Sequence, residues 1–325
     1  MFRHGAKNNY ACDTMDESLH SGVPKKYYSV KNKKFGEWEI PPWELFVFTD
    51  RQIGEGSFSR VYLAKWRETF VVAKVIKEEI ISEKKFLILR EIDIMSKLHH
   101  PNIVQFLGYT DDPFIIVMEY IPNNNLRENY GLLSKSMKIS IMKDILRGLA
   151  YIHNRRPYSL IHRDIKPTNI ILTNSRVAKI TDFGLSKFYS LTKTFSHMNL
   201  ASLDDYNDVP DGETPENAIT ANTANMAELY DNDLTTDVGT YRFMAPEMDG
   251  NQGNQEYTNK IDIYSCGALL YEMFENKKFI DKANISWYKT PKLLRTIILD
   301  NMLAYNPDDR IDALTLLKML DKNKI

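Results

Sequence analysis

The sequence predicts an α+β fold of two lobes, in which a small five-stranded antiparallel sheet with one helix precedes a larger, mostly helical lobe. Two patterns lead to this prediction. Between residues 49 and 120, short runs of β-branched and aromatic residues alternate with turn residues, and one amphipathic stretch interrupts them. After residue 122, apolar residues recur at three- and four-residue spacing, which is typical of helices. We therefore expect a cleft between the lobes, near the connection after Met118.

The small lobe is expected over about residues 48–118. The runs RQIGEGSFSRVYLAKW (51–66) and FVVAKVI (70–76) predict its first strands, and NIVQFLGY (102–109) and FIIVMEY (114–120) predict the last two. Between them, residues 83–98 are predicted to be a helix with one apolar side, formed by Leu87, Ile94, Met95 and Leu98.

The large lobe is expected over about residues 122–321. Its first long helix is predicted by a periodic set of apolar residues: Met137, Ile141, Ile145, Leu149 and Ile152. Residues 259–275 are apolar on most sides, which indicates a buried helix. Residues 293–303 and 312–320 predict two further helices.

The overall composition excludes several classes of protein. The 42 basic and 43 acidic residues leave a net charge of −1, so a nucleic-acid partner is not expected. The two cysteines, Cys12 and Cys266, are too few for a disulfide framework or a cysteine zinc site. The run FIIVM (114–118) is far shorter than the roughly 20 apolar residues that cross a bilayer, and the first residues lack the apolar core of a signal peptide. We expect a cytoplasmic protein without a transmembrane segment.

Residues 1–47 form an N-terminal extension that is predicted to be partly disordered. Its stretch PKKYYSVKNKK (24–34) contains five lysines, which fits either a solvated tail or an arm that contacts an anionic partner or membrane surface. Residues 38–48 differ, because two tryptophans flank Pro41 and Pro42. That pattern predicts an extended strap packed on the edge of a domain.

A second polar region interrupts the large lobe. Residues 204–237 contain ten acidic residues and no lysine or arginine. Such a stretch is too polar to bury itself and too long for an ordinary connection. We predict a disordered acidic insertion over about residues 190–235.

Three groups of residues point to phosphate chemistry. In IGEGSFSRVY (53–62), Gly54 and Gly56 would let the backbone fold closely over a ligand, although a glycine pair in a hairpin is often only a turn. On the predicted helix, Glu91 falls on the side of Leu87 and Met95. A carboxylate in that position is either a surface residue near the stripe or a buried group that needs a cation, for which Lys74 is the natural partner.

The third group is SLIHRDIKPTN (159–169), which is followed by TDFGLS (181–186). Here Asp164 can accept a proton from an attacking hydroxyl, and Lys166 can neutralise charge on a phosphoryl group. The amide oxygen of Asn169 and the carboxylate of Asp182 are hard donors of the kind that Mg²⁺ prefers. Each acid alone could be a helix cap or a turn former, but this order and spacing favour a catalytic site.

Together these motifs resemble those of the eukaryotic protein kinases. The resemblance covers about residues 48–321. Among kinase groups, these motifs are most similar to those of the tyrosine-kinase-like group, which mostly phosphorylates serine and threonine. It rests on these stretches: GEGSFSRVY (54–62), VVAK (71–74), RE (90–91), HRDIKPTN (162–169), DFG (182–184), GTYRFMAPE (239–247), DIYSCG (262–267) and Arg310.

The resemblance implies roles for the matched residues. The catalytic residues would be Asp164 as base, with Lys166, Lys74 and its partner Glu91, while Asn169 and Asp182 would hold Mg²⁺. ATP would be bound by Ile53, Gly54, Glu55, Gly56, Ser57, Phe58, Ser59, Val61, Ala73, Lys74, Met118, Glu119, Ile121 and Ile171. An apolar spine between the lobes would comprise Met95, Phe106, His162 and Phe183. A buried ion pair in the large lobe would join Glu247 and Arg310.

Several positions depart from the family pattern. Ser59 replaces the third glycine of the loop, Tyr264 stands where tryptophan is usual, and Ile311 stands where proline is usual. The interval from Asp262 to Arg310 is also short, which predicts trimmed helices there. The phosphate and metal residues are all present.

The resemblance implies an ATP- and Mg²⁺-dependent protein serine/threonine kinase acting on protein substrates. Lys166 and Thr240 favour serine and threonine over tyrosine, while dual specificity stays open. The alternatives are a catalytically silent scaffold of the same fold and a small-molecule kinase of related fold. Thr236, four residues before Thr240, is a candidate for activating phosphorylation by an upstream kinase or by trans-autophosphorylation, with Arg163 as the cation that would bind the phosphate.

Overall fold

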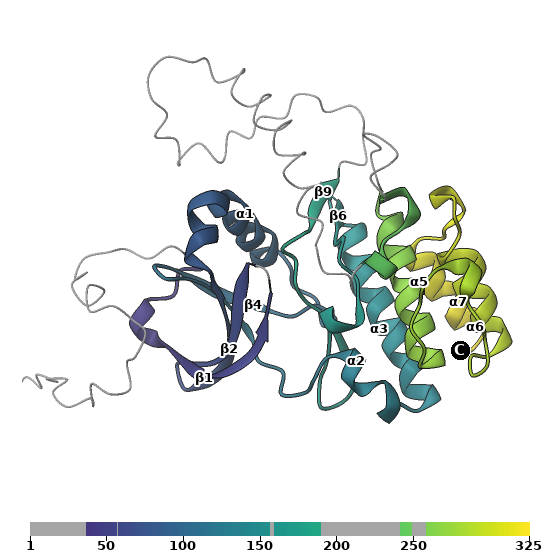
Figure 1. The fold of residues 1–325 in the computed structure, drawn as a ribbon, viewed down its shortest axis with the longest axis horizontal. Coiled ribbons are helices and arrows are strands. Elements are labelled where there is room, and N and C mark those ends of the chain that lie inside the picture. The colour runs from purple at the N-terminus through teal and green to yellow at the C-terminus, as the bar shows by residue number, and fades with distance from the viewer. Residues whose placement is uncertain (1–36, 57, 157–158, 190–240, 249–257) are drawn as a thin grey trace, which may run out of the picture.

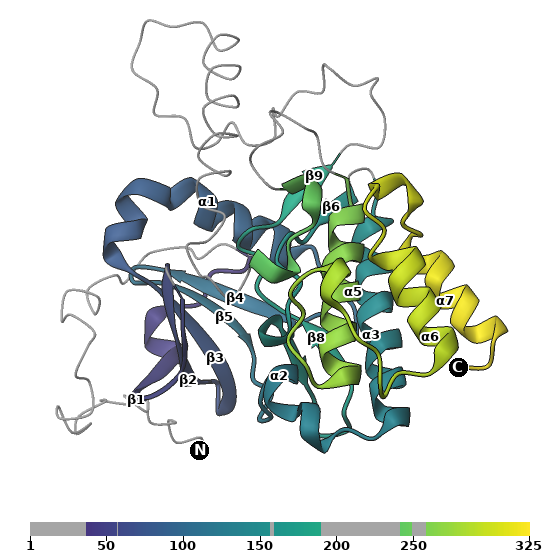
Figure 2. The ribbon, with the colours of Figure 1, turned by 45° about the vertical axis from the view of Figure 1, so that its right-hand side comes forward.

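The computed structural model describes residues 37–56, 58–156, 159–189, 241–248 and 258–325. Within these ranges the chain forms the expected two lobes, which lie side by side in both ribbon views (Figures 1 and 2). The predicted tail before residue 37 and the predicted acidic insertion lie outside the described residues. No helix in the described ranges combines the length and apolarity needed to cross a bilayer.

The small lobe is a five-stranded antiparallel sheet in the order β1-β2-β3-β5-β4. Its strands are β1 (Leu45–Glu55), β2 (Ser59–Trp66), β3 (Thr69–Ile76), β4 (Phe106–Asp111) and β5 (Phe114–Glu119). Helix α1 (Glu78–Ser96) packs beside this sheet (Figure 1). The helix begins five residues before the predicted start, because Glu78 and Glu79 in its first turn favour a helix N-terminus.

The predicted strap docks on the free edge of the sheet. The Ile40 amide donates to the Tyr109 carbonyl at 2.7 Å, and the Tyr109 amide donates to the Trp38 carbonyl at 2.9 Å. This approach requires glycine at position 108, where φ is +156° and an added Cβ would lie 2.7 Å from the Trp38 carbonyl oxygen. The Trp38 ring also lies 5.6 Å from that of Phe106. The strap prediction is confirmed, while Leu45–Val47, expected in the extension, belong to β1.

The large lobe is mostly helical. Its helices are α2 (Leu126–Asn129), α3 (Lys135–His153), α5 (Lys260–Glu275), α6 (Lys292–Thr296) and α7 (Ala313–Lys322). Short strand pairs β6 (Ser159–Ile161) with β9 (Lys187–Tyr189) and β7 (Ile170–Leu172) with β8 (Ala178–Ile180) frame the loops between α3 and α5. The single helix predicted over 293–303 is instead α6 followed by a π-helical turn, Ile297–Met302.

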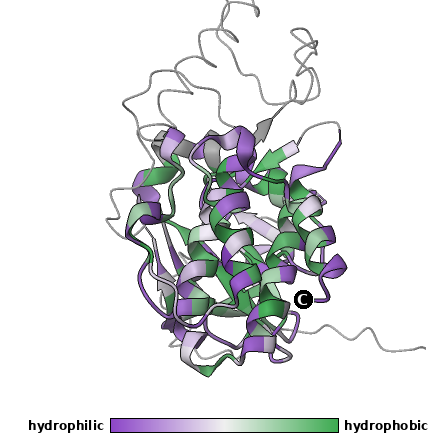
Figure 3. Cartoon of the chain, turned by 90° about the vertical axis from the view of Figure 1, so that its right-hand side faces the viewer, coloured by the Kyte–Doolittle hydropathy of each residue, from purple (hydrophilic) through white to green (hydrophobic). Residues whose placement is uncertain are grey.

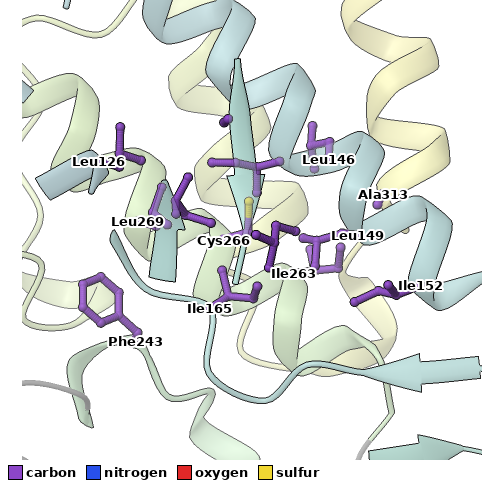
Figure 4. Packing of buried hydrophobic residues seen from close by; sticks show 14 of the residues in the cluster. Leu126, Leu146, Leu149, Ile152, Ile165, Phe243, Ile263, Cys266, Leu269 and Ala313 are labelled. Atoms are coloured by element: carbon purple, nitrogen blue, oxygen red, sulfur yellow. The ribbon is translucent and has the colours of Figure 1, made fainter. Parts of the chain in front are cut away.

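One buried hydrophobic cluster runs through both lobes. It includes Met95 and Phe106 from the small lobe and Phe183 and Leu269 from the large lobe. Figure 4 shows part of it, where residues of α3, α5 and α7 surround Cys266. Figure 3 views the large lobe end-on, with hydrophobic residues between its helices and hydrophilic residues along its outer edge. This shared core fixes the position of the loops that lie between the lobes.

Candidate active site

Lys74 lies between two carboxylates from different elements. It comes from β3, and its Nζ lies 2.6 Å from Oε1 of Glu91 on α1 and 3.2 Å from Oδ1 of Asp182. The Lys74 and Glu91 side chains are almost buried, whereas the Asp182 side chain is 46% exposed. The predicted Lys74–Glu91 pair is therefore confirmed, and the alternative of a surface Glu91 is wrong.

The three charges influence one another strongly. Burial opposes ionisation of Lys74, but Glu91 and Asp182 outweigh it and raise the pKa of Lys74. Burial raises the pKa of Glu91, an effect that Lys74 opposes and Asp182 adds to. Lys74 in turn lowers the pKa of Asp182. With two acids around one lysine, this group carries an excess of negative charge next to solvent.

Asp164 lies in the loop after β6 and is almost buried. Its Oδ2 accepts hydrogen bonds from Nζ of Lys166 at 2.9 Å and from Nδ2 of Asn169 at 2.9 Å. Its Oδ1 is buried and has no hydrogen-bond donor among the described residues. Burial raises the pKa of Asp164, Lys166 opposes the rise, and Asp182 adds to it. One oxygen of Asp164 is thus fixed by two donors, while the other keeps its capacity to accept a hydrogen bond.

The loop that carries Asp164 is anchored by Asp262 at the start of α5. The buried Asp262 carboxylate accepts from the amides of His162 and Arg163, each at 2.8 Å, and pairs with Nε2 of His153 at 2.8 Å. These bonds stabilise a backbone in which Arg163 has a φ of +71°. Sequence reasoning included Asp262 in a motif without assigning it this role, although an acid in an otherwise apolar helix was the available signal.

Asp182 also sits on a strained backbone, with a φ of +66°. The next side chain, Phe183, is buried and meets the His162 ring edge-on at 4.8 Å between centroids. This contact agrees with a packing role for His162. Gly184 follows, where an added Cβ would lie 3.4 Å from Oε2 of Glu91. A side chain at this position would therefore touch Glu91 at about ordinary contact distance.

The residues predicted to bind ATP come from β1, β2, β3, β5 and β7 and from the segments that follow β1 and β5. Gly54 pairs with Val61 and Glu55 with Arg60 across β1 and β2, and the Gly56 amide donates to the Ser59 carbonyl at 2.9 Å. Ser57, at the loop tip, lies outside the described residues. Ala73 and Met118 are buried in β3 and β5, Ile171 is half-buried in β7, and Ile53 is 50% exposed on β1.

Two lysines that sequence reasoning missed hold this region in place. Lys77, just before α1, donates to the Gly56 carbonyl at 3.0 Å and lies 3.3 Å from Oε1 of Glu55. Lys179 on β8 lies 2.6 Å from Oε1 of Glu119 at the end of β5, so it joins the two lobes. Neither lysine belongs to a motif, because the contact in each case depends on tertiary structure.

The large-lobe ion pair is present as predicted. Arg310 NH1 lies 2.6 Å from Oε1 of Glu247, and its NH2 lies 2.8 Å from Oε2. Thr236 and Thr240, by contrast, lie outside the described residues, so the predicted contacts of their hydroxyls stay predictions.

A comparison with protein-family models matches the protein kinase domain at residues 48–204 and 221–320. Similar curated proteins include serine/threonine-protein kinase VIK of Arabidopsis thaliana, 32% identical over 250 residues, which are 74% of this chain and 48% of the relative. Serine/threonine-protein kinase CTR1 of the same plant is 31% identical over 249 residues (73% and 25%). Probable serine/threonine-protein kinase drkD of Dictyostelium discoideum is 30% identical over 262 residues (77% and 16%). The chain spans about half or less of the length of these relatives.

Proposed function

The chain belongs to the protein kinase domain family, and we propose that it transfers the γ-phosphate of ATP to serine and threonine hydroxyls of protein substrates. The observation that carries this proposal is the meeting of Lys74, Glu91 and Asp182 beside the buried, half-satisfied carboxylate of Asp164. The influence of Asp182, which adds to the rise in the pKa of Asp164, supports the proposal that both acids belong to one site.

ATP would bind around this site. Adenine would lie between Ile53 and Val61 above and Ile171 below, beside Ala73 and Met118. The half-exposed Ile53 supports this, because a bound ring would cover apolar surface that is now open to solvent. The backbone of Glu119 and Ile121 would pair with the base. The loop from Gly54 to Ser59 would cover the phosphates, which Lys74 would contact.

The donors present also fit Mg²⁺. Asp182 has one carboxylate oxygen without a hydrogen bond from the described residues, and Asn169 uses its amide nitrogen on Asp164, which leaves the amide oxygen for a cation. No cluster of three or more His, Cys, Asp or Glu that could enclose a metal occurs in the described ranges. Two protein oxygens completed by phosphate oxygens and water are what Mg²⁺ commonly accepts. The ion would neutralise charge on the phosphates.

Asp164 would accept the proton of the substrate hydroxyl. Its Oδ2 is held by Lys166 and Asn169, so its free Oδ1 is the atom that would take the proton. Lys166, two residues after Asp164, would stabilise charge on the transferring group. The three relatives described above are named as serine/threonine-protein kinases, one of them as probable, which supports serine and threonine hydroxyls as the acceptors.

The test is a Mg-ATP assay with phosphosite mapping and phosphoamino-acid analysis. We expect phosphoserine or phosphothreonine from the wild type and a turnover on the order of 10²–10⁴ lower from Asp164→Asn. Asp300→Asn, an exposed aspartate on the π-helical turn, is the matched control and should keep full activity. Equal turnover in Asp164→Asn and wild type would contradict the assignment, and phosphotyrosine among the products would favour dual specificity.

We further propose that phosphorylation of Thr236, by an upstream kinase or in trans, activates the enzyme. A phosphate carries a charge of roughly −1.5 to −2 and would dock against Arg163, which lies next to the base. Thr236→Ala should keep low basal activity and lose the increase that follows preincubation with ATP, while Thr235→Ala should activate normally. Full activation of Thr236→Ala, with no phosphate at Thr236 in active enzyme, would overturn this.

A further inference from the structure

Lys77 contacts both sides of the loop between β1 and β2, which is the loop proposed to cover the phosphates. Its backbone amide donates to the Phe58 carbonyl at 3.0 Å, which continues the pairing of β2 with β3 toward the loop. Its Nζ donates to the Gly56 carbonyl at 3.0 Å and lies 3.3 Å from Oε1 of Glu55. One residue from outside the loop thus holds the chain before and after the loop tip.

The place of Lys77 in the fold gives these contacts a fixed base. Lys77 lies directly between β3 and α1, and its side chain is only 23% exposed. Strand β3 is paired with β2 on one side and with β5 on the other. The same strand carries Lys74, three residues earlier, which is proposed to contact the phosphates. The residue that holds the loop and the residue for the phosphates therefore belong to one rigid element and its extension.

Glu55 is an unexpected residue for a loop that would cover phosphates, because its negative charge would repel them. In this structure the carboxylate is surrounded by donors: besides Lys77, it accepts from Nε2 of Gln52 at 3.2 Å and from Nε of Arg60 at 3.4 Å. The hydrogen bond from Lys77 contributes most to lowering the pKa of Glu55, followed by that from Gln52. Two cations thus offset one anion, and Glu55 can link the loop to Lys77 without leaving the loop negatively charged.

The contact with Gly56 also fixes the direction of a peptide group. The Gly56 carbonyl accepts from Lys77, while the Gly56 amide donates to the Ser59 carbonyl at 2.9 Å. The C=O and N–H of a trans peptide point in opposite directions, so a fixed Gly56 carbonyl would also orient the N–H of that peptide group. Successive backbone N–H groups are donors that can surround phosphate oxygens. A loop oriented before the nucleotide arrives loses less conformational freedom when it binds.

We propose that Lys77 is a positioning residue of the nucleotide site, which orients the loop from Gly54 to Ser59 for phosphate binding through Glu55 and the Gly56 carbonyl. The proposal rests on the kinase function proposed above and adds to it a residue that belongs to none of the motifs. The contact would matter for nucleotides, whose phosphates meet the loop, and not for adenosine, which has no phosphate.

Two simpler roles of Lys77 lead to different expectations. If Lys77 were only a free cation that attracts phosphates, Glu55 would compete with the phosphates for it, and removal of Glu55 would strengthen nucleotide binding. If Lys77 only stabilised the junction of β3 with α1, its loss would affect adenosine and nucleotides alike. The proposed role differs from both, because Glu55 would support nucleotide binding despite its charge.

The test compares the affinity of the full chain for MgADP and for adenosine by isothermal titration calorimetry. Lys77→Ala should weaken MgADP binding on the order of tenfold, the usual effect of one charge-assisted hydrogen bond, and should leave adenosine binding unchanged. Glu55→Ala should also weaken MgADP binding, by about threefold, since the Gly56 contact is kept. The double variant should bind MgADP no more weakly than Lys77→Ala, because both substitutions break one contact. Lys77→Arg, which can still donate to Glu55, should recover part of the loss.

Lys65→Ala is the matched control. Lys65 lies on β2 and pairs with Glu68 at the end of the β2–β3 hairpin that is remote from the loop. Its loss removes the same charge and a similar ion pair from the same sheet, so both affinities should equal those of the wild type.

Three results would overturn the proposal: unchanged MgADP affinity in Lys77→Ala, tighter MgADP binding by Glu55→Ala, or an equal loss of adenosine and MgADP binding in Lys77→Ala. The second result would make Lys77 a free cation, and the third would make its role purely structural. A wild type that binds MgADP, with variants that match it, contradicts this inference alone. A wild type that binds no MgADP contradicts the proposed kinase function as well.

Discussion

The two lobes each contain a buried basic residue paired with a glutamate, but the two pairs are built differently. Arg310 in the large lobe uses all five of its N–H donors within the protein. Two meet Glu247, and three meet the carbonyls of Ala304, Lys260 and Tyr305 at 2.8–3.1 Å. Lys74 in the small lobe uses two of its three donors, and its partners are two acids rather than one acid and neutral carbonyls.

This difference separates a structural pair from a pair that is prepared for a ligand. A buried charge whose donors are all satisfied contributes to one fixed conformation, and nothing is left for a substrate to bind. The group around Lys74 keeps a free donor, a half-exposed carboxylate on Asp182 and an excess of negative charge. A cation at Asp182 would offset that excess, and the free donor of Lys74 would be left for a phosphate, as expected of a pair prepared for a ligand.

The largest effect is expected from Lys74→Met, which tests the ligand-binding side of the comparison. Activity should fall about 10²–10³-fold, because the contact to the phosphates and the electrostatic balance at Asp182 are lost. The melting temperature should fall less than in Arg310→Met, since Glu91, whose pKa burial already raises, can take up a proton. Initial rates with Mg-ATP and a thermal unfolding scan provide the two measurements. If Lys74→Met kept normal rates but lost much of its stability, Lys74 would stabilise the fold, as Arg310 does, rather than bind a ligand.

Arg310→Met tests the structural side. It leaves the Glu247 carboxylate and three carbonyls without their donor, which should lower the free energy of unfolding by about 3–5 kcal/mol. Urea unfolding at pH 7 measures the change. Arg67→Met is the control, because Arg67 makes a similar two-point contact with Glu44 at the surface and should matter little. Similar losses in both variants would mean that saturation of the buried donors is not what stabilises the large lobe.

The sequence predicted the residues of the site better than the contacts that hold them. Glu91 could be assigned because its position on the helix stripe was visible in the sequence, and the order of Asp164, Asn169 and Asp182 indicated a metal and a base. The supporting contacts of Lys179 with Glu119 and of Lys77 with Gly56 join residues 60 and 21 positions apart. Neither periodicity nor spacing carries information about such pairs.

The fold was predictable for a similar reason. The spacing of apolar residues predicted the five-stranded sheet and the long helices α3 and α5. These elements bury one or more continuous apolar faces, so their apolar residues recur regularly in the sequence. The break between α6 and the π-helical turn was not visible, since residues 293–303 keep an apolar pattern across it.

Glu275 provides a test with a smaller expected effect. Like Arg310, it is a buried charged residue of the large lobe whose hydrogen bonds are made within the protein. Its buried carboxylate accepts from the amides of Tyr288, Lys289 and Thr290 and from the Thr290 hydroxyl. Burial opposes its ionisation, but these donors prevail and lower its pKa. Glu275→Gln should therefore cost about 1–3 kcal/mol at neutral pH, because an amide cannot accept all of these bonds.

The pH dependence of that loss follows from the direction of the shift. A carboxylate whose pKa is lower in the folded than in the unfolded protein stabilises the fold at a pH above its unfolded-state pKa, which is near 4.5 for glutamate. This added stability is lost as the pH falls through the folded-state pKa. The gap between wild type and Glu275→Gln, measured by urea unfolding, should be full at pH 7 and narrow progressively below about pH 4.5. Glu68→Gln, whose side chain is 89% exposed, should show no such gap. If the difference in free energy of unfolding between wild type and Glu275→Gln grew in acid, the pKa shift would have the opposite direction. The loop from 288 to 290 would then not stabilise the ionised form of Glu275.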